Sequence, residues 1–208
     1  LVGSEMCIRD SPDATLANGL VLSNMLLNRI RTRTFKGTGQ TSSLAYHYSG
    51  NTIWPVSVSR SFGEGPQTTL FTLDRYDERG NLLQSTDPNG ISTTYLWGYG
   101  GTRLVAEIRN AAYQQVANVL GQARIDAMTD RITLSESDIA ALEGLRSAAA
   151  LGDTQITTYT HHPIFGVTSR TDPRGVRTSY LYDETGRIKE IADDAGNPVV
   201  AYDYKYRK

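Results

Sequence analysis

The stretch that decides the fold is residues 182–196, which read YDETGRIKEIADDAG. It contains the pattern Asp-x-x-Gly twice, at Asp183–Gly186 and at Asp193–Gly196. Asp first and Gly last is the residue preference of a type I β-turn, because Asp accepts backbone hydrogen bonds and Gly tolerates a positive φ. About six residues remain between the turns, which is the length of one short strand. The stretch therefore predicts antiparallel strands joined by tight turns.

The same pattern occurs at three further places in the chain, at residues 77–80, 87–90 and 172–175. Two of these copies carry Pro at the second position, where its fixed φ suits a type I turn. The predicted turn residues are Asp77, Gly80, Asp87, Pro88, Gly90, Asp172, Pro173, Gly175, Asp183, Gly186, Asp193 and Gly196.

Aromatic and apolar residues alternate with polar ones between these turns, as expected for strands with a side-chain period of two. We expect one face of a strand to carry Tyr95, Trp97 and Tyr99. The alternation is clearest in the last segment, where Ala201, Asp203 and Lys205 alternate with four larger residues, Val200, Tyr202, Tyr204 and Tyr206. In the segment before this one, Ile188 and Ile191 are three residues apart and break the period of two. This spacing predicts a β-bulge or a strand that is buried on both faces.

Two longer blocks also recur. Residues 86–88, Thr-Asp-Pro, return at 171–173, and residues 76–78, Tyr-Asp-Glu, return at 182–184. Internal repeats of this kind indicate structural units that bury their faces against neighbouring units.

The pattern Tyr-Asp-x-x-Gly-x-Leu, followed by Asp-Pro-x-Gly and a Thr-x-Tyr strand, resembles the YD repeats of bacterial Rhs and Tc-toxin-like proteins. The resemblance covers residues 70–105 and 156–206. It implies a mainly β protein whose antiparallel meander is part of a curled β-sheet shell, often enclosing a toxin domain. It also implies an extracellular or cell-surface protein of a bacterium, with an export signal outside this fragment. The partners it implies are the flanking repeats of the same polypeptide and an encapsulated toxin domain.

Four segments are expected along the chain. Residues 1–11, LVGSEMCIRDS, resemble read-through of a sequencing adapter and are interpreted as non-native. Residues 12–105 and 153–208 are predicted to be β-repeat segments, and residues 106–152 an α-helical insertion.

The insertion is predicted from its alanine-rich composition and its capping residues. Asn110 is interpreted as the N-cap of a helix over 111–120 that ends at Gly121. Ser135 and Asp138 resemble a capping box, followed by helical spacing of apolar residues up to Gly152. Two helices are expected, with residues 122–134 left unassigned.

Composition excludes several functional classes. The 208 residues carry a formal net charge of −1, so there is no electrostatic reason to expect nucleic acid as a partner. The single cysteine, Cys7, allows neither an intrachain disulfide nor a cysteine metal site. No apolar run has the length of a membrane span. No cofactor is expected.

Two aspartates and a pair of histidines are the candidate catalytic or metal-binding residues, and each of them also has a purely structural explanation. Asp87 and Asp172 stand in Asp-Pro-x-Gly sequences, and Rhs proteins are similar in carrying Asp-Pro-x-Gly-Leu where the toxin is released by self-cleavage. Here the last position is Ile91 or Val176 instead of Leu, and the motif occurs twice in phase with ordinary turns. Adjacent histidines at 161–162 point to opposite faces of a strand, so no metal site is predicted.

The sequence therefore predicts a non-catalytic structural wall segment of a large Rhs/YD-repeat, polymorphic-toxin-like protein. One alternative is a carbohydrate- or cell-surface-binding module that contacts a glycan through Tyr95, Trp97 and Tyr99, although such rings also pack across strands. The other alternative is a self-processing toxin core that uses an Asp-Pro-x-Gly acid.

Overall fold

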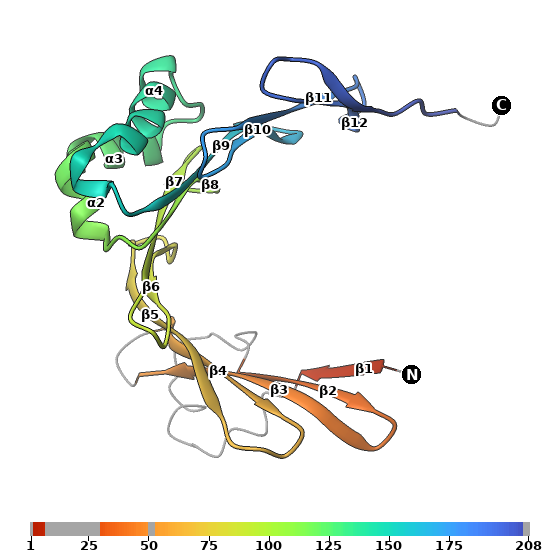
Figure 1. Cartoon of the computed structure of the whole chain (residues 1–208). Helices are drawn as coiled ribbons and strands as arrows, with labels where there is room; N and C mark the ends of the chain where they lie inside the picture. Colours follow the sequence, from red (N-terminus) through yellow and green to blue (C-terminus); the bar gives the residue numbers. More distant parts are fainter. Residues whose placement is uncertain (1, 7–29, 50–52, 206–208) are drawn as a thin grey trace. The chain divides into compact units, whose positions relative to one another are not determined.

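A computed structural model describes residues 2–6, 30–49 and 53–205 (Figure 1). The chain divides into two compact units, Leu1–Ile91 and Ser92–Lys208. Both units are built from antiparallel strands that pair in the order in which they occur in the sequence.

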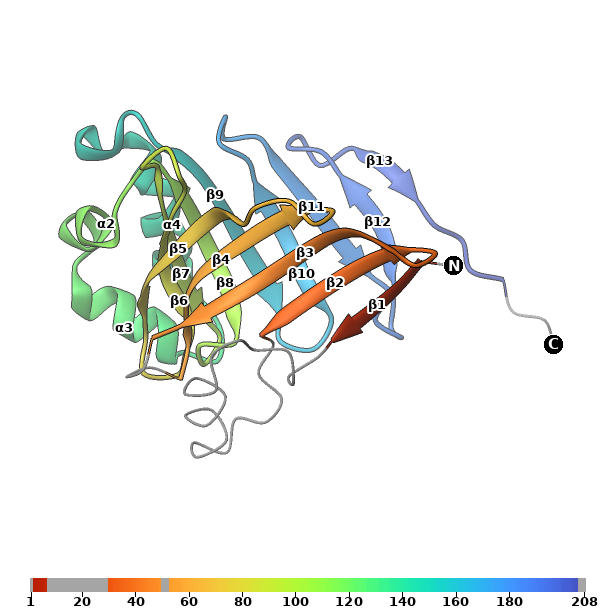
Figure 2. The same cartoon turned by 90° about the horizontal axis from the view of Figure 1, so that it is seen from below.

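The first unit contains six of the strands. Figure 2 shows β2, β3 and β4 of this unit side by side. The strands are β1 (Val2–Met6), β2 (Arg31–Lys36), β3 (Gly39–Tyr48), β4 (Pro55–Phe62), β5 (Thr68–Tyr76) and β6 (Leu82–Thr86). Strand β1 pairs with β2 and lies inside the predicted adapter segment, whose residues 7–11 fall outside the described part of the chain.

One face of β3 and β4 is lined by small residues. Ser43 faces Ser61 and Ala45 faces Ser59 in the antiparallel register, and all four are buried. The larger side chains of Leu44 and the tyrosines at 46 and 48 alternate with them and are half-buried on the other face. The first unit therefore buries few large apolar side chains among its described residues.

The second unit contains the remaining strands and every helix of the described residues. Its strands are β7 (Ser92–Gly98), β8 (Arg103–Arg109), β9 (Gln155–His162), β10 (Gly166–Thr171), β11 (Arg177–Tyr182), β12 (Ile188–Ala192) and β13 (Pro198–Ala201). A bulge at Lys189 shifts the register between β11 and β12, as the broken parity of Ile188 and Ile191 predicts.

The helical insertion connects β8 to β9. Its elements are α2 (Tyr113–Leu120), α3 (Gln122–Asp130), α4 (Glu136–Gly144) and the 3-10 turns Leu145–Ser147 and Ala149–Leu151. Gly121 ends α2 as predicted, and the Ser135–Asp138 capping box starts α4 as predicted. The unassigned residues 122–134 contain a third helix, α3, so the expectation of two helices was too low.

The predicted N-cap at Asn110 is wrong, because Ala112 occupies that position. Asn110 adopts a left-handed backbone conformation with φ of +67° and terminates β8. Its amide donates to the carbonyl of Ser92, and its side chain donates to the carbonyl of Asp153. Asn tolerates this conformation better than most residues, which explains its place at the exit from the strand.

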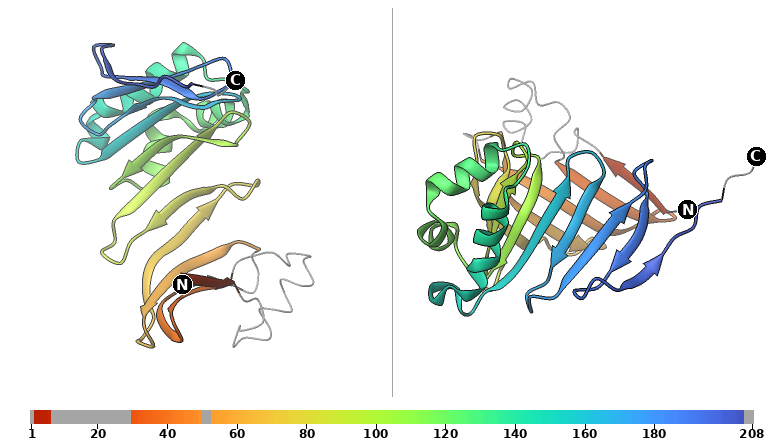
Figure 3. Two further views of the ribbon diagram at one scale, coloured as in Figure 1. Left: turned by 90° about the vertical axis from the view of Figure 1, so that its right-hand side faces the viewer. Right: turned by 90° about the horizontal axis from the view of Figure 1, so that it is seen from above.

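The apolar core of the second unit lies between the insertion and one face of β7, β8 and β9 (Figure 3). Gly98 marks the tightest point, since a Cβ there would come within 2.8 Å of Val105. The buried strand residues include Thr94, Leu96, Ile108 and Ile156, and the buried helix residues include Val116, Ile125, Met128, Leu142 and Leu145.

The predicted fold class is therefore confirmed as mainly β, an antiparallel meander with a small helical insertion. Among the helices of the described residues, none combines the length and hydropathy that crossing a bilayer requires.

Candidate functional site

The five Asp-x-x-Gly turns share one hydrogen-bond pattern. In the turn between β11 and β12, the Gly186 amide donates to the Asp183 carbonyl at 3.0 Å, and the Asp183 amide donates to the Arg187 carbonyl at 2.8 Å. The carboxylate of Asp183 also accepts from the amides of Thr185 and Arg187. The equivalent backbone bonds close the turns that begin at Asp77, Asp87, Asp172 and Asp193.

The last residue of each turn requires glycine. Gly80, Gly90, Gly175, Gly186 and Gly196 have φ values between +81° and +86°, where other L-residues are strained. Pro88 and Pro173 occupy the second position of the turns Asp87–Gly90 and Asp172–Gly175.

Two of these glycines also lie under an aromatic ring. A Cβ on Gly80 would meet the indole nitrogen of Trp54 at 2.6 Å, and a Cβ on Gly186 would meet the ring of Phe165 at 2.8 Å. No such neighbour lies within 4 Å of Gly90 or Gly175. The two turns that begin with Tyr-Asp therefore carry an extra packing constraint.

The tyrosine before each of these two turns is fastened to the preceding strand. Tyr76 donates its hydroxyl to the carbonyl of Pro55 at 2.8 Å, and Tyr182 donates to Val167 at 2.7 Å. Tyr204, after β13, donates to the carbonyl of Ile188 at 2.9 Å. We call each of these three bonds a tyrosine clasp.

Aromatic contacts surround the clasps. Trp54 stacks on Tyr76 with ring centroids 5.4 Å apart, and Phe165 lies 5.8 Å from Tyr182. Burial, together with the nearby Tyr48, raises the pKa of Tyr76 to about 12, so its hydroxyl remains a donor at neutral pH. Burial also raises the pKa of Tyr182.

The turn carboxylates of the second unit favour the ionised state. The side chain of Thr185 and the amide and guanidinium of Arg187 hold the pKa of Asp183 well below its usual range. The amide of Val176 and the contacts of Arg174 lower the pKa of Asp172. A general acid must hold a proton at working pH, so the Asp172 environment opposes that role.

The predicted glycan contacts do not form one continuous strand face. Tyr95 and Trp97 lie in β7 and are half-buried, and their alternation with buried Thr94 and Leu96 places them on the face away from the helices. Tyr99 lies beyond the end of β7 with φ of +55°. The hydroxyl of Tyr99 accepts from the amide of His161, and its ring meets the His161 ring edge-on. The strand prediction for Tyr99 was therefore wrong.

The two adjacent histidines have separate structural contacts. The Nε2 atom of His161 lies 2.8 Å from the carbonyl of Leu104, and burial lowers the His161 pKa. His162 stacks on Phe165 with ring centroids 4.3 Å apart. In the described part of the chain, no group of three or more metal-ligating side chains gathers.

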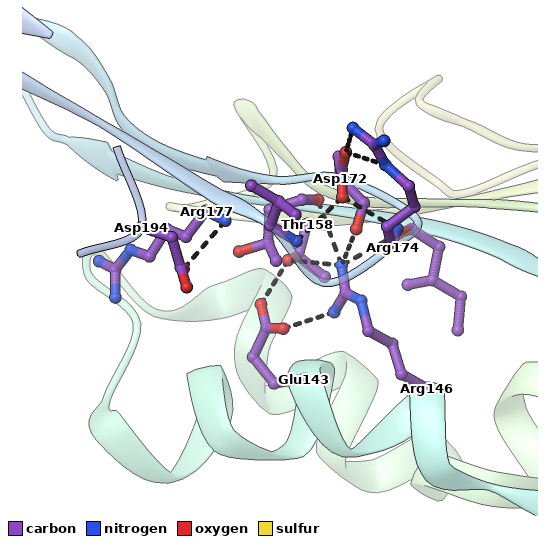
Figure 4. A network of polar contacts seen from close by, with 10 residues as sticks. Glu143, Arg146, Thr158, Asp172, Arg174, Arg177 and Asp194 are labelled. Atoms are coloured by element: carbon purple, nitrogen blue, oxygen red, sulfur yellow. Dashed lines mark hydrogen bonds and ion pairs between the residues drawn. The ribbon is translucent and has the colours of Figure 1, made fainter. Parts of the chain in front are cut away.

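A polar network fastens the insertion to the strands, and Figure 4 shows it. The guanidinium of Arg146 donates to the carbonyls of Ile156, Thr171 and Asp172 at 3.0–3.3 Å. Glu143 accepts from Arg146 and from the hydroxyl of Thr158. The insertion thus holds the backbone at the start of the Asp172 turn.

A pocket of about 230 Å3 lies beside this network, between α4 and the strands β9, β10 and β11. Ile139 and Glu143 contribute from α4, and Arg177 and Asp194 contribute from the strand ends. The lining also includes the hydroxyl residues Thr158, Thr160, Ser169 and Thr171. Sequence reasoning missed this pocket, because its residues come from one helix, three strands and two turns and form no motif.

The RHS Repeat family model matches the chain at residues 76–114 and 166–198. A search of curated proteins returned no match. Among solved structures, the chain is similar to the crystal structure of TcdB2-TccC3-Cdc42, with 14% identity and a TM-score of 0.41 over 92% of this chain and 8% of that chain.

Two further solved structures are similar. The crystal structure of TcdB2-TccC3 without its hypervariable C-terminal region shows 13% identity and a TM-score of 0.39, over 82% of this chain and 9% of that one. The Photorhabdus luminescens Tc holotoxin pore with a mutated TccC3 shows 14% identity and a TM-score of 0.37, over 95% of this chain and 11% of that one. The chain spans a small fraction of the length of these solved chains.

The repeated turns and strands define a β-repeat protein. Both matched regions contain a Tyr-Asp or Asp-Pro turn of the described geometry. Residues 76–114 and 166–198 therefore carry repeats of the Rhs type.

Proposed function

We propose that the chain is a structural wall segment of a large secreted or surface Rhs/YD-repeat protein and that it performs no chemistry itself. The observation that supports this proposal is the repeated combination of turn and tyrosine clasp, which occurs in both units with the same bonding. These residues serve the continuity of the sheet, since their polar groups bond to neighbouring backbone.

The parent protein is proposed to enclose a toxin domain, with flanking repeats of the same polypeptide as the immediate partners. Sequencing the source locus across both ends of this segment tests that proposal. We expect further Asp-x-x-Gly repeats in frame, followed by a domain without them. A reading frame that lacks further repeats would contradict it.

The wall function is tested with the purified chain, by measuring thermal unfolding and glycan-array binding of the wild type and Tyr182→Phe. We expect the substitution to lower the melting temperature, and we expect neither protein to bind glycans saturably. Time-dependent appearance of a shortened product that Asp172→Asn abolishes would instead favour a self-processing core.

A glycan-binding module remains the second candidate, because Tyr95 and Trp97 share a half-buried strand face opposite the insertion. Aromatic rings on such a face can stack on sugars. If this function is correct, Trp97→Ala abolishes glycan binding while the melting temperature changes little. If Trp97 serves packing, the same variant lowers the melting temperature and no binding is lost.

A further inference from the structure

We propose that His161, Tyr99 and Leu104 form an acid-sensitive latch that fastens the turn between β7 and β8 to the strand β9. The latch is closed while the imidazole ring of His161 is neutral, and it opens when that ring is protonated. These contacts are separate from the Asp-x-x-Gly turns and the tyrosine clasps, so the inference does not depend on the proposed wall function.

Two hydrogen bonds hold the latch closed. The Nε2 atom of His161 bonds to the carbonyl of Leu104 at 2.8 Å, and the backbone amide of His161 donates to the hydroxyl of Tyr99, also at 2.8 Å. The rings of Tyr99 and His161 meet edge-on, with their centroids 5.3 Å apart. Tyr99 lies in the turn after β7 and Leu104 lies in β8, so both the turn and the strand that follows it are tied to β9.

The bond to Leu104 decides which ring nitrogen of His161 carries the proton. A carbonyl oxygen only accepts, so in the neutral ring the proton is on Nε2 and the Nδ1 atom is unprotonated. That Nδ1 atom is buried and has no hydrogen-bond partner within the described part of the chain. A second proton on the ring would therefore sit on a buried nitrogen that no acceptor faces, which is costly. The imidazolium is relieved of this cost only when the ring leaves its site.

Burial and a neighbouring cation also oppose the protonated ring. Burial of His161 lowers its pKa, the bond to the Leu104 carbonyl raises that pKa in part, and Arg103 on β8 lowers it again. The carbonyl already bonds to Nε2 in the neutral ring, so it offers the Nδ1 proton no partner. The environment of the closed latch therefore favours the neutral imidazole.

The other charged groups on the neighbouring strands supply no negative charge opposite His161. On β10, Arg170 pairs with Tyr159, two residues before His161, and adds a further positive charge. Glu107 is the only acidic residue of the strands β7–β10. It pairs with Thr157, four residues away from His161 along β9. An imidazolium at position 161 would therefore lack a carboxylate partner on these strands.

The latch opens at mildly acidic pH. The pKa of His161 is lower in the folded chain than its value of about 6.5 in an unfolded chain, so the unfolded chain binds more protons as the pH falls. The contribution of the latch to stability is therefore fully present above about pH 6.5. It is lost as the pH falls from there toward the folded pKa.

The test is an NMR titration of the whole chain, with long-range proton–nitrogen spectra that report the protonation of each ring nitrogen. We expect His161 to carry its proton on Nε2 at about pH 7.5 and to titrate below about pH 6.5. The backbone amide of His161 should lose protection from hydrogen exchange, relative to its intrinsic rate, over the same pH range. Titration of His161 at or above about pH 6.5 would overturn the proposal, because it would show that the Tyr99 ring stabilises the imidazolium.

A variant that cannot be protonated separates the latch from the other titrating groups. His161→Gln keeps a side-chain amide that can donate to the Leu104 carbonyl. We expect the melting temperature of the wild type to fall severalfold more between about pH 7.5 and about pH 5.5 than that of His161→Gln. An equal fall in both proteins would overturn the proposal. His47→Gln, in the first unit, is the matched control and should retain the wild-type loss of protection at the His161 amide.

A second variant keeps the histidine and removes the neighbouring charge. In Arg103→Gln the pKa of His161 should rise, so the loss of protection at the His161 amide should begin at a higher pH than in the wild type. Arg124→Gln, an exposed arginine on α3, is the control and should leave the His161 pKa unchanged. A His161 pKa that stays the same or falls in Arg103→Gln would overturn the role of Arg103 in the latch.

Discussion

The glycines of the turns differ in what surrounds them, although they share one backbone conformation. Gly186 packs under Phe165, whereas the space above Gly175 is open. Both have a φ above +80°, so an alanine at either position is strained by the backbone alone.

We predict that Gly186→Ala destabilises the second unit more than Gly175→Ala. Gly175→Ala, at the open position, should lower the free energy of unfolding by about 1–2 kcal/mol through backbone strain alone. Gly186→Ala, at the packed position, should lower the free energy of unfolding by more, because the new methyl group displaces the Phe165 ring. Urea denaturation of both variants measures the difference, and equal losses would contradict the packing role of Phe165.

The tyrosine clasps allow a second prediction at the same scale. Tyr182→Phe keeps the ring and removes only the hydroxyl that donates to Val167, so the expected loss is about 0.5–1.5 kcal/mol. Tyr180→Phe, in the same strand, removes a hydroxyl that makes no hydrogen bond within the described part of the chain. This variant should leave the free energy of unfolding nearly unchanged. The free energy of unfolding of the two variants is the measurement.

The turn carboxylates predict a pH dependence. The pKa of Asp183 is lower in the folded chain than its value of about 3.9 in an unfolded chain. The contribution of Asp183 to the free energy of unfolding is therefore fully present above about pH 4. It is lost as the pH falls toward the folded pKa. Asp183→Asn should flatten the acid limb of a stability–pH curve, which urea denaturation of both proteins at a series of pH values measures. An unchanged acid limb would contradict the prediction.

At the scale of elements, one side chain of the insertion, that of Arg146, bonds to several backbone carbonyls of the strands and the turn after β10. We predict that Arg146→Met destabilises the second unit by about 1.5–3 kcal/mol, because it removes charge-assisted bonds to partly buried carbonyls. Arg124→Met on α3 is the exposed control. Hydrogen exchange should also become faster in the turn that starts at Asp172, and unchanged exchange there would contradict the fastening role.

The elements show why some predictions succeeded and others failed. The strands and turns were predicted from sequence because Asp-x-x-Gly specifies a turn through its own local hydrogen bonds, as at Asp183. The end of β7 was missed because Tyr99 follows the alternating pattern, although it lies in the turn between β7 and β8, where the Thr102 amide donates to the carbonyl of Gly98. The N-cap was wrongly predicted at Asn110, because Asn favours both helix N-caps and the left-handed conformation found at the end of a strand.

The expected strand over Val200 to Tyr206 is shorter in the structure. β13 ends at Ala201, and Tyr206 lies outside the described residues. Tyr204 stacks beside Tyr202 and under the guanidinium of Arg187, so its alternation reflects a clasp and ring contacts instead of ladder pairing. The pocket had no sequence signal at all, since only the tertiary fold brings Glu143 and Asp194 to one place.

At the scale of the whole molecule, the two units differ in what they bury. Among the described residues, the first unit buries mainly serines and alanine on its strands, whereas the second buries a cluster of large apolar side chains under its helices. Apolar burial is the main favourable term in folding. We therefore expect the second unit to be the more stable.

Hydrogen exchange followed by mass spectrometry checks this expectation. Amides of β7–β9 should exchange more slowly than those of β5, most of whose residues are exposed. Slower exchange in β5 than in β8 would contradict it. A Val116→Ala substitution should speed exchange across the second unit, because it opens a cavity in the buried core.

The tyrosine clasps all point in one direction along the chain. Tyr76 reaches back to Pro55, Tyr182 to Val167 and Tyr204 to Ile188. A ribosome delivers the N-terminal partner of each pair first, so every clasp can close as soon as its own tyrosine emerges, without waiting for any later residue. Synthesis and sheet assembly can therefore proceed in step, and each hairpin can be secured before the next one is made.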